Sequence, residues 1–253
     1  MSTKREVVLS LDKVSLRIPV FSKTELSLKK SFYRAVTGSR VSYQNNISSV
    51  EALNSISLNI HRGEKIALIG HNGSGKTSFI RLISGIYQPT SGCLKTSVSV
   101  YPMIQRSFIV EEELTGVESV KAHYLMMHNS LKGFQNFLED ITEFSGLGDF
   151  IFLPLKTYSE GMSSRLMFAI LTSQYHECLA LDEGLGTGDK QFYAKAQDRL
   201  NSFLNKSGSL FIASHSNELL RKFCLRGIVF SSGKLIFDGG IEEALTFYEE
   251  HSH

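Results

Sequence analysis

Short apolar runs alternate with stretches of helical periodicity along the chain, and this alternation predicts an α/β fold. Strands are predicted at residues 7–11, 14–18, 52–60, 65–69, 96–101, 178–181, 210–213, 228–230 and 234–237. Helices are predicted after residue 75, over most of 115–144 with breaks at Gly133 and Gly146, at 166–171 and at 241–250. Residues 88–92 have the composition of a turn, and Ser231-Ser232-Gly233 predicts a hairpin.

The strand at 65–69 leads into a glycine-rich loop that fits the phosphate-loop pattern G-x-x-x-x-G-K-[ST]. The loop reads Gly70-His71-Asn72-Gly73-Ser74-Gly75-Lys76-Thr77. Its glycines allow consecutive backbone N–H groups to surround a polyphosphate, and the helix that follows, with Ser78, adds its positive dipole end. Lys76 is suited to contact the β- and γ-phosphates and Thr77 to bind Mg²⁺. The sequence therefore predicts a nucleoside triphosphate site.

Two further predicted strands end in polar residues suited to the same site. One is followed by Asp182-Glu183 and the next by His215. Ligands of open α/β sheets bind at the carboxyl ends of the strands, so we expect these side chains near the phosphates. Asp182 is expected to hold Mg²⁺ opposite Thr77, and Glu183 to act on the attacking water as general base or as the group that orients it. His215 is expected to donate a hydrogen bond to the γ-phosphate.

A basic insertion at residues 21–47 is not explained by the phosphate-loop core. Between Lys23 and Arg40 it holds five basic residues against one acidic residue. Leu28, Phe32 and Val36 recur at helical spacing, which predicts a short amphipathic helix. Two interpretations stay open: a solvated surface helix packed on the sheet, or a basic patch facing an anionic membrane or a membrane partner.

Composition excludes several classes of protein. The 253 residues are 42% hydrophobic and 21% charged with a net charge of +2, which gives no indication of a nucleic-acid partner. Cys93, Cys178 and Cys224 are too far apart to indicate a zinc site or a disulfide framework. No run approaches the roughly 20 apolar residues of a transmembrane helix, and the cytoplasm is the expected compartment.

With these motifs in this order, the chain resembles the ATP-binding subunit of ABC transporters. The family's motifs fall at residues 70–77 (Walker A), Tyr158-Ser159-Glu160-Gly161-Met162 (signature), 178–182 (Walker B), Glu183 (catalytic glutamate) and His215 (switch histidine). A Y-S-x-G-M signature followed by Arg165 resembles the branch that exports cell-surface polysaccharides such as O-antigen, capsule or teichoic acid. Similar to that branch too are the basic insertion, residues 113–116, 154–157 and 188–189, and Phe192.

The resemblance implies one ABC ATP-binding domain over residues 1–253. Its P-loop NTPase core with an antiparallel β subdomain would comprise residues 1–104 and 174–253, and an inserted helical subdomain residues 105–173. It also implies a homodimer that holds two ATP molecules with Mg²⁺ between its subunits. The signature of one subunit, with Ser159, Gly161 and a helix start near Ser163, would then face the γ-phosphate bound by Lys76 of the other.

The function implied is ATP hydrolysis that energises export of a lipid-linked polysaccharide across the cytoplasmic membrane. An integral membrane permease would dock on the helical subdomain, with this subunit peripheral on the cytoplasmic face. The alternatives are the ATPase of another ABC exporter, for lipid or drug, and a non-transport ABC ATPase acting on DNA or ribosomes.

At several positions that are characteristic of the family, this chain offers a candidate residue or a different residue. Gln105 is the candidate for the glutamine that links Mg²⁺ to the permease interface, and Asp189 for the aspartate after Walker B. Phe21 or Tyr43 would stack on adenine, with Phe21 preferred. Glu160 replaces a small residue, and its carboxylate is unfavourable near a polyphosphate unless it turns away. Because the chain ends at His253, we expect no C-terminal sugar-binding domain of the kind that longer O-antigen exporters carry.

Overall fold

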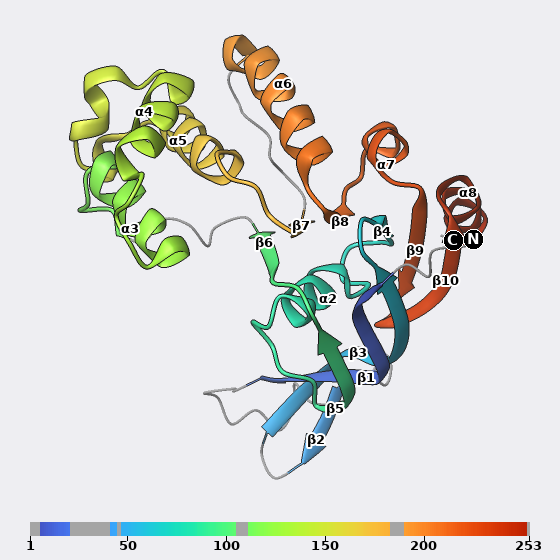
Figure 1. Cartoon of the computed structure of the whole chain (residues 1–253). Helices are drawn as coiled ribbons and strands as arrows, with labels where there is room; N and C mark the ends of the chain where they lie inside the picture. The colour runs from blue at the N-terminus through green and yellow to red at the C-terminus, as the bar shows by residue number, and fades with distance from the viewer. Residues whose placement is uncertain (1–5, 21–40, 45–46, 105–110, 183–189, 252–253) are drawn as a thin grey trace. The chain divides into compact units, whose positions relative to one another are not determined.

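A computed structural model of the chain describes residues 6–20, 41–44, 47–104, 111–182 and 190–251 (Figure 1). These residues belong to two compact units. Unit 1 comprises Met1–Pro102, Glu177–Asp182 and Gly208–His253, and unit 2 comprises Met103–His176 and Glu183–Ser207. The predicted helical subdomain ends at residue 173, whereas unit 2 also includes the helix Lys190–Lys206. In the described ranges no helix is both long enough and apolar enough to cross a bilayer.

A six-stranded sheet forms the core of unit 1. Its strand order is β10-β9-β4-β8-β7-β6, with bounds β4 Lys65–Ile69, β6 Val100–Ile104, β7 Cys178–Asp182, β8 Ser209–Ala213, β9 Arg226–Ser231 and β10 Lys234–Gly240. Strand β4 runs parallel to both β8 and β9, and β7 runs parallel to β8, as expected for buried apolar strands in an α/β fold. The predicted hairpin of β9 and β10 is confirmed.

A second, antiparallel sheet has the order β2-β3-β1-β5, which confirms the predicted antiparallel β part of the fold. Its strands are β1 Val7–Val20, β2 Val41–Gln44, β3 Ile47–His61 and β5 Ser91–Thr96. The two strands predicted at 7–11 and 14–18 are one continuous strand. A register shift between Leu11 and Val14 interrupts the hydrophobic pattern there, and Lys13 at that bulge has a left-handed φ of 48°.

The strand predicted at 96–101 is wrong, because the chain changes sheets inside it. Strand β5 ends at Thr96 and β6 begins at Val100. The Thr96 hydroxyl donates to the Val98 carbonyl at 2.7 Å and accepts from the Val98 N–H at 3.3 Å. These side-chain bonds replace the sheet ladder, so the backbone turns between the two strands.

Among its described residues, unit 1 has the helices α2 Lys76–Ile83, α7 Asn217–Phe223 and α8 Ile241–His251. The Phe79 side chain of α2 is fully buried, and its ring lies 6.0 Å from the Phe211 ring of β8 and 5.2 Å from the Phe230 ring of β9. This aromatic cluster holds α2 on the sheet. Helix α8, predicted at 241–250, packs against β9 and β10 (Figure 1).

Unit 2 is helical. Its helices are α3 Gly116–His128, α4 Phe134–Ser145, α5 Glu160–Thr172 and α6 Lys190–Lys206, with short 3₁₀ turns η1 Gly148–Phe152 and η2 Leu155–Thr157. The predicted breaks are confirmed, since Gly133 and Gly146 flank α4 in left-handed conformations. A capping box of Thr115 and Glu118 begins α3. Helix α6 joins this unit by packing on α5.

Candidate nucleotide-binding site

Three neighbouring parallel strands of unit 1 deliver the predicted site residues to one edge of the sheet. Ala213 of β8 is in register with Leu68 of β4 on one side and with Asp182 of β7 on the other. The phosphate loop follows β4, and His215 comes two residues after β8. The loop, Asp182 and His215 therefore leave the sheet at the same level, at the carboxyl ends of its strands.

The phosphate loop is held in shape by two glycines in conformations that an L side chain rarely adopts. Gly70 has φ 149°, and a Cβ there would lie 2.4 Å from the Phe230 carbonyl oxygen. Gly75 has φ 118°, and a Cβ would lie 3.0 Å from the Ala52 carbonyl oxygen. The Gly233 N–H donates to the Ser74 carbonyl at 2.7 Å, so the β9–β10 turn is hydrogen-bonded to the loop.

Polar groups inside the loop fit a phosphate ligand. The Lys76 ammonium, only 7% exposed, donates to the carbonyls of Gly70 at 2.6 Å and of His71 at 3.1 Å. The Ser74 hydroxyl is fully buried and finds no hydrogen-bond partner among the described residues. Helix α2 begins at Lys76 without a side-chain cap and without an acidic residue in its first turn. Orphan donors and a positive helix end are the features that an anion satisfies.

Three further predicted residues of unit 1 lie in the loop or at the strand ends beside it. Thr77 and Asp182 are half-buried, and His215 is exposed. Helix α2, which carries Thr77, packs against β7, which ends at Asp182. In the described part of the chain no cluster of three or more acidic, histidine or cysteine side chains could hold a metal by itself. A Mg²⁺ ion at Thr77 and Asp182 would therefore depend on the oxygens of a bound triphosphate.

Not all predicted residues fall in the described part of the chain. Glu183, Asp189, Gln105 and Phe21 lie outside the described residues, as does the predicted basic helix at 28–38. Tyr43 lies in β2, where the backbone alone is described.

The signature motif begins helix α5 in unit 2. The Ser159 hydroxyl accepts a hydrogen bond from the Met162 N–H at 3.2 Å, so Ser159 is the N-cap and the helix starts at Glu160. The predicted start near Ser163 is therefore wrong by three residues, because the cap draws Gly161 and Met162 into the first turn. A Cβ at Gly161 would meet only the Ser159 hydroxyl, at 3.9 Å. Nothing in the described chain requires glycine there.

The first residue of the motif has a structural role. The Tyr158 hydroxyl donates to the Phe150 carbonyl at 2.8 Å, and burial raises the pKa of Tyr158 above its ordinary value. A Cβ at Gly116 would lie 2.4 Å from that hydroxyl, so the start of α3 is pressed against Tyr158. Tyr158 thus fixes the loop before α5 to the rest of unit 2.

Glu160 lies in the first turn of α5, where a carboxylate is favoured by the helix dipole. It also lines a cavity of about 330 Å³ in unit 2. Leu155, Leu166, Met167 and Ile170 supply the apolar lining of this cavity. Its polar lining is Glu112, Ser119, His123, Lys156, Tyr158, Glu160 and Ser163. We call it the α3–α5 cavity. Sequence reasoning missed it, because its walls come from two segments, residues 112–123 and 155–170, that lie far apart in the chain.

Comparison with known proteins gives the class of this chain. A family model described as ABC transporter matches residues 53–186, more than half of the chain. The O-antigen export system ATP-binding protein RfbE of Yersinia enterocolitica is 36% identical over 214 residues, covering 84% of this chain and 90% of that protein. The chain therefore belongs to the ABC transporter family and is an ATPase of that family.

Other relatives carry teichoic acid names. The teichoic acids export ATP-binding protein TagH of Staphylococcus haemolyticus is 34% identical, covering 82% of this chain and 78% of that protein. TagH of Bacillus anthracis is 31% identical and matches 96% of this chain, which spans 42% of the length of that relative. A solved structure titled as a dimeric post-hydrolysis state of the ATP-binding cassette MJ0796 bound to ADP and Pi has a TM-score of 0.65. It is 16% identical, with 92% of this chain and 98% of that chain covered, and shows the shared fold.

Proposed function

We propose that this chain is the ATP-hydrolysing subunit of an exporter that moves a lipid-linked cell-surface polysaccharide across the cytoplasmic membrane. The observation that carries the ATPase part is the convergence of the phosphate loop, Asp182 and His215 at one sheet edge. The transport part is supported by relatives at 31–36% identity whose names are export ATP-binding proteins for O-antigen and teichoic acids. The subunit would act on the cytoplasmic face, bound to an integral membrane permease.

Each residue of the site has a role in this proposal. Lys76 would turn from its present carbonyl partners to the β- and γ-phosphates of ATP, and the Ser74 hydroxyl would gain a phosphate partner. Thr77 and Asp182 would hold Mg²⁺, which neutralises phosphate charge when bound. His215, exposed at the sheet edge, would donate to the γ-phosphate.

A second copy of the chain would complete the site. The Ser159 hydroxyl, which caps α5 by accepting from the Met162 N–H, and the N–H groups at the start of α5 would form the anion site of this second copy. Gly161 leaves the approach to these groups open. In a head-to-tail dimer they would bind the γ-phosphate held by Lys76 of the partner, so ATP would join the two subunits and hydrolysis would release them.

The variant Glu183→Gln tests the proposed role of Glu183. It removes a general base without changing side-chain volume, and we expect a fall in turnover of roughly 10²-fold or more with retained ATP binding. The ATP-bound dimer should accumulate, as measured by light scattering. Glu177→Gln is the matched control, because Glu177 lies just before the opposite end of β7 and pairs with Arg62 on the surface. Unchanged turnover in Glu183→Gln would refute the assignment.

For the permease we propose the α3–α5 cavity as the docking site. Lys156 is paired with Glu113 at 2.6 Å, so Glu112 and Glu160 leave the cavity wall with an acidic balance. Together with the apolar lining this favours a cytoplasmic loop of the permease that inserts an apolar side chain flanked by lysine or arginine. The binding surface is thus specified by its shape and its charge.

Filling the cavity tests this docking site. Met167→Trp should obstruct the cavity, while the isolated subunit keeps its turnover. The amount of co-expressed permease that co-purifies should fall by roughly tenfold, which corresponds to a loss of about 1.4 kcal/mol in binding free energy. Met126→Trp is the matched control, because Met126 is 67% exposed on α3. Equal permease recovery with both variants would refute the docking site and leave the assigned ATPase chemistry untouched.

A further inference from the structure

Strand β3 of unit 1 contains a bulge at Asn54 and Ser55. The pairing of β1 with β3 shifts register between Val14 and Leu16, so these two residues lie opposite the single residue Ser15. Ser55 has a left-handed φ of 51°, and its N–H donates to the Ser15 hydroxyl oxygen at 2.9 Å. We call Asn54 and Ser55 the β3 bulge. A side chain, rather than the backbone ladder, therefore holds the backbone of Ser55.

The β3 bulge is hydrogen-bonded to the phosphate loop through one residue of the β9–β10 turn. The Asn54 N–H donates to the Gly233 carbonyl at 2.8 Å, and the Gly233 N–H donates to the Ser74 carbonyl at 2.7 Å. The three segments are also in close contact, since a Cβ at Gly75 would lie 3.0 Å from the Ala52 carbonyl oxygen and 3.4 Å from the Gly233 Cα. Gly233 therefore connects the antiparallel sheet with the phosphate loop.

The connecting turn is short, and both of its ends are fixed. Ser231 and Lys234 are paired across the hairpin, so two residues make the turn. These residues, Ser232 and Gly233, have φ values of 50° and 77°, as in a type I′ turn. A two-residue turn has few alternative conformations. A displacement of the β3 bulge would therefore move Gly233, and with it the Ser74 carbonyl, instead of being absorbed by the turn.

The position of Ser74 matters for ATP because its buried hydroxyl is one of the groups that a phosphate would satisfy. We propose that the β3 bulge preorganises the phosphate loop for ATP. Ser55 is then a positioning residue, whose left-handed conformation places the Asn54 N–H against Gly233. A loop that is already ordered binds its ligand without the free-energy cost of ordering. The inference rests on the proposed role of the phosphate loop.

Substitutions at Ser55 test the inference through its backbone conformation. A β-branched residue is strained at a left-handed φ, whereas glycine adopts this conformation freely. In Ser55→Val the loop should be ordered in only part of the population, which should raise the KM for ATP and the Kd of Mg-ATP by roughly tenfold. The kcat at saturating ATP should stay within about twofold of the parent, because bound ATP restores the ordered loop. Ser55→Gly should keep the parental KM.

The matched control is Lys13→Val. Lys13 lies in the same sheet with a left-handed φ of 48°, and its N–H donates to the Ser57 hydroxyl oxygen at 3.0 Å, within that sheet. Valine should strain both sites and lower the urea unfolding midpoint in both variants, but only Ser55→Val should raise the KM for ATP. Without nucleotide, the amide hydrogen of Gly233 should exchange faster in Ser55→Val and at the parental rate in Lys13→Val.

A second variant keeps the test decisive if Ser55→Val does not fold. Ser15→Ala removes the acceptor of the Ser55 N–H without changing β3, and it should raise the KM for ATP by roughly two- to tenfold. A parental KM in every Ser15→Ala or Ser55→Val protein that folds, or an equal rise in Lys13→Val, would overturn the proposal. Lys76→Ala is measured alongside. If it binds Mg-ATP as tightly as the parent, the proposed role of the phosphate loop fails, whereas loss of binding in Lys76→Ala with a parental KM in Ser55→Val refutes the β3 bulge alone.

Discussion

Gly161 offers a substitution for which folding and function should respond in opposite directions. It is the second residue of α5, and its φ lies outside the left-handed region. Alanine at this position would place its Cβ near a single atom, the Ser159 hydroxyl oxygen at 3.9 Å, which is ordinary contact. Among the described residues, therefore, the methyl group added by Gly161→Ala meets no steric clash.

The two effects can be estimated. Replacing a helical glycine by alanine where the backbone permits it stabilises a protein by about 0.4–1 kcal/mol, mostly by restricting the unfolded chain. In the assembled dimer the same methyl group would stand between the α5 N–H groups and the partner's γ-phosphate. Overpacking of that kind costs about 1–3 kcal/mol, which corresponds to a loss of roughly 5- to 150-fold in turnover or in dimer affinity.

Two measurements on one protein preparation check the prediction. Urea unfolding without nucleotide should give a midpoint equal to or above that of the parent, and steady-state ATPase activity should fall. Gly116→Ala is the contrasting variant, because its Cβ would lie 2.4 Å from the Tyr158 hydroxyl and 2.7 Å from the Ile151 carbonyl, which should lower the midpoint. If Gly161→Ala hydrolyses ATP at the parental rate, or unfolds as early as Gly116→Ala, the reasoning about the signature is refuted.

Two further outcomes concern unit 2. Burial lowers the pKa of His123 to about 4. Between about pH 6.5 and pH 4, therefore, the unfolded chain binds a proton at this residue that the folded chain does not. The free energy of unfolding should fall as the pH falls through that range, by up to about 3 kcal/mol. His123→Gln should flatten this part of a stability–pH profile measured with denaturant, and an unchanged slope would contradict the prediction. Thr115→Ala removes the side-chain cap of α3 and should cost about 1 kcal/mol in the same assay, and Thr115→Ser should restore it.

The phosphate loop could be predicted from the sequence because its chemistry depends on residues that are consecutive. Lysine and threonine directly after spaced glycines, as at Lys76 and Thr77, are specific to phosphate binding when a strand precedes them and a helix follows. The apolar strand before the loop is specified by its own composition. Asp182 and His215 required one more step, the rule that parallel strands present their carboxyl ends at one edge. The register of β4, β7 and β8 follows that rule.

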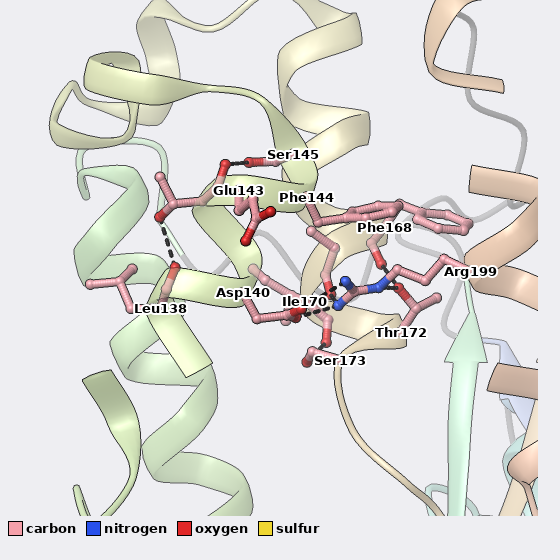
Figure 2. Close-up of polar contacts among 12 residues, drawn as sticks. Leu138, Asp140, Glu143, Phe144, Ser145, Phe168, Ile170, Thr172, Ser173 and Arg199 are labelled. Atoms are coloured by element: carbon pink, nitrogen blue, oxygen red, sulfur yellow. Dashed lines mark hydrogen bonds and ion pairs between the residues drawn. The ribbon is translucent and has the colours of Figure 1, made fainter. Parts of the chain in front are cut away.

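The features that sequence reasoning missed depend on single side chains or on distant contacts. Thr96 ends a strand through two bonds to Val98, although the surrounding residues suit a strand. Ser159 starts a helix three residues before the predicted start near Ser163. The α3–α5 cavity and the hydrogen bond from the Arg199 guanidinium to the Asp140 carboxylate (Figure 2) join residues far apart in the chain, and no local pattern contains such contacts.

The cap at the start of α5 limits which side chains could replace Ser159. A hydroxyl oxygen that accepts the Met162 N–H still has its own hydrogen to give, so one atom can serve the helix on one side and an anion on the other. Aspartate would cap the helix equally well but would repel a phosphate, and alanine would serve neither partner. In the proposed dimer, only a small alcohol at this position would let the subunit fold and contact the partner's nucleotide without one requirement weakening the other.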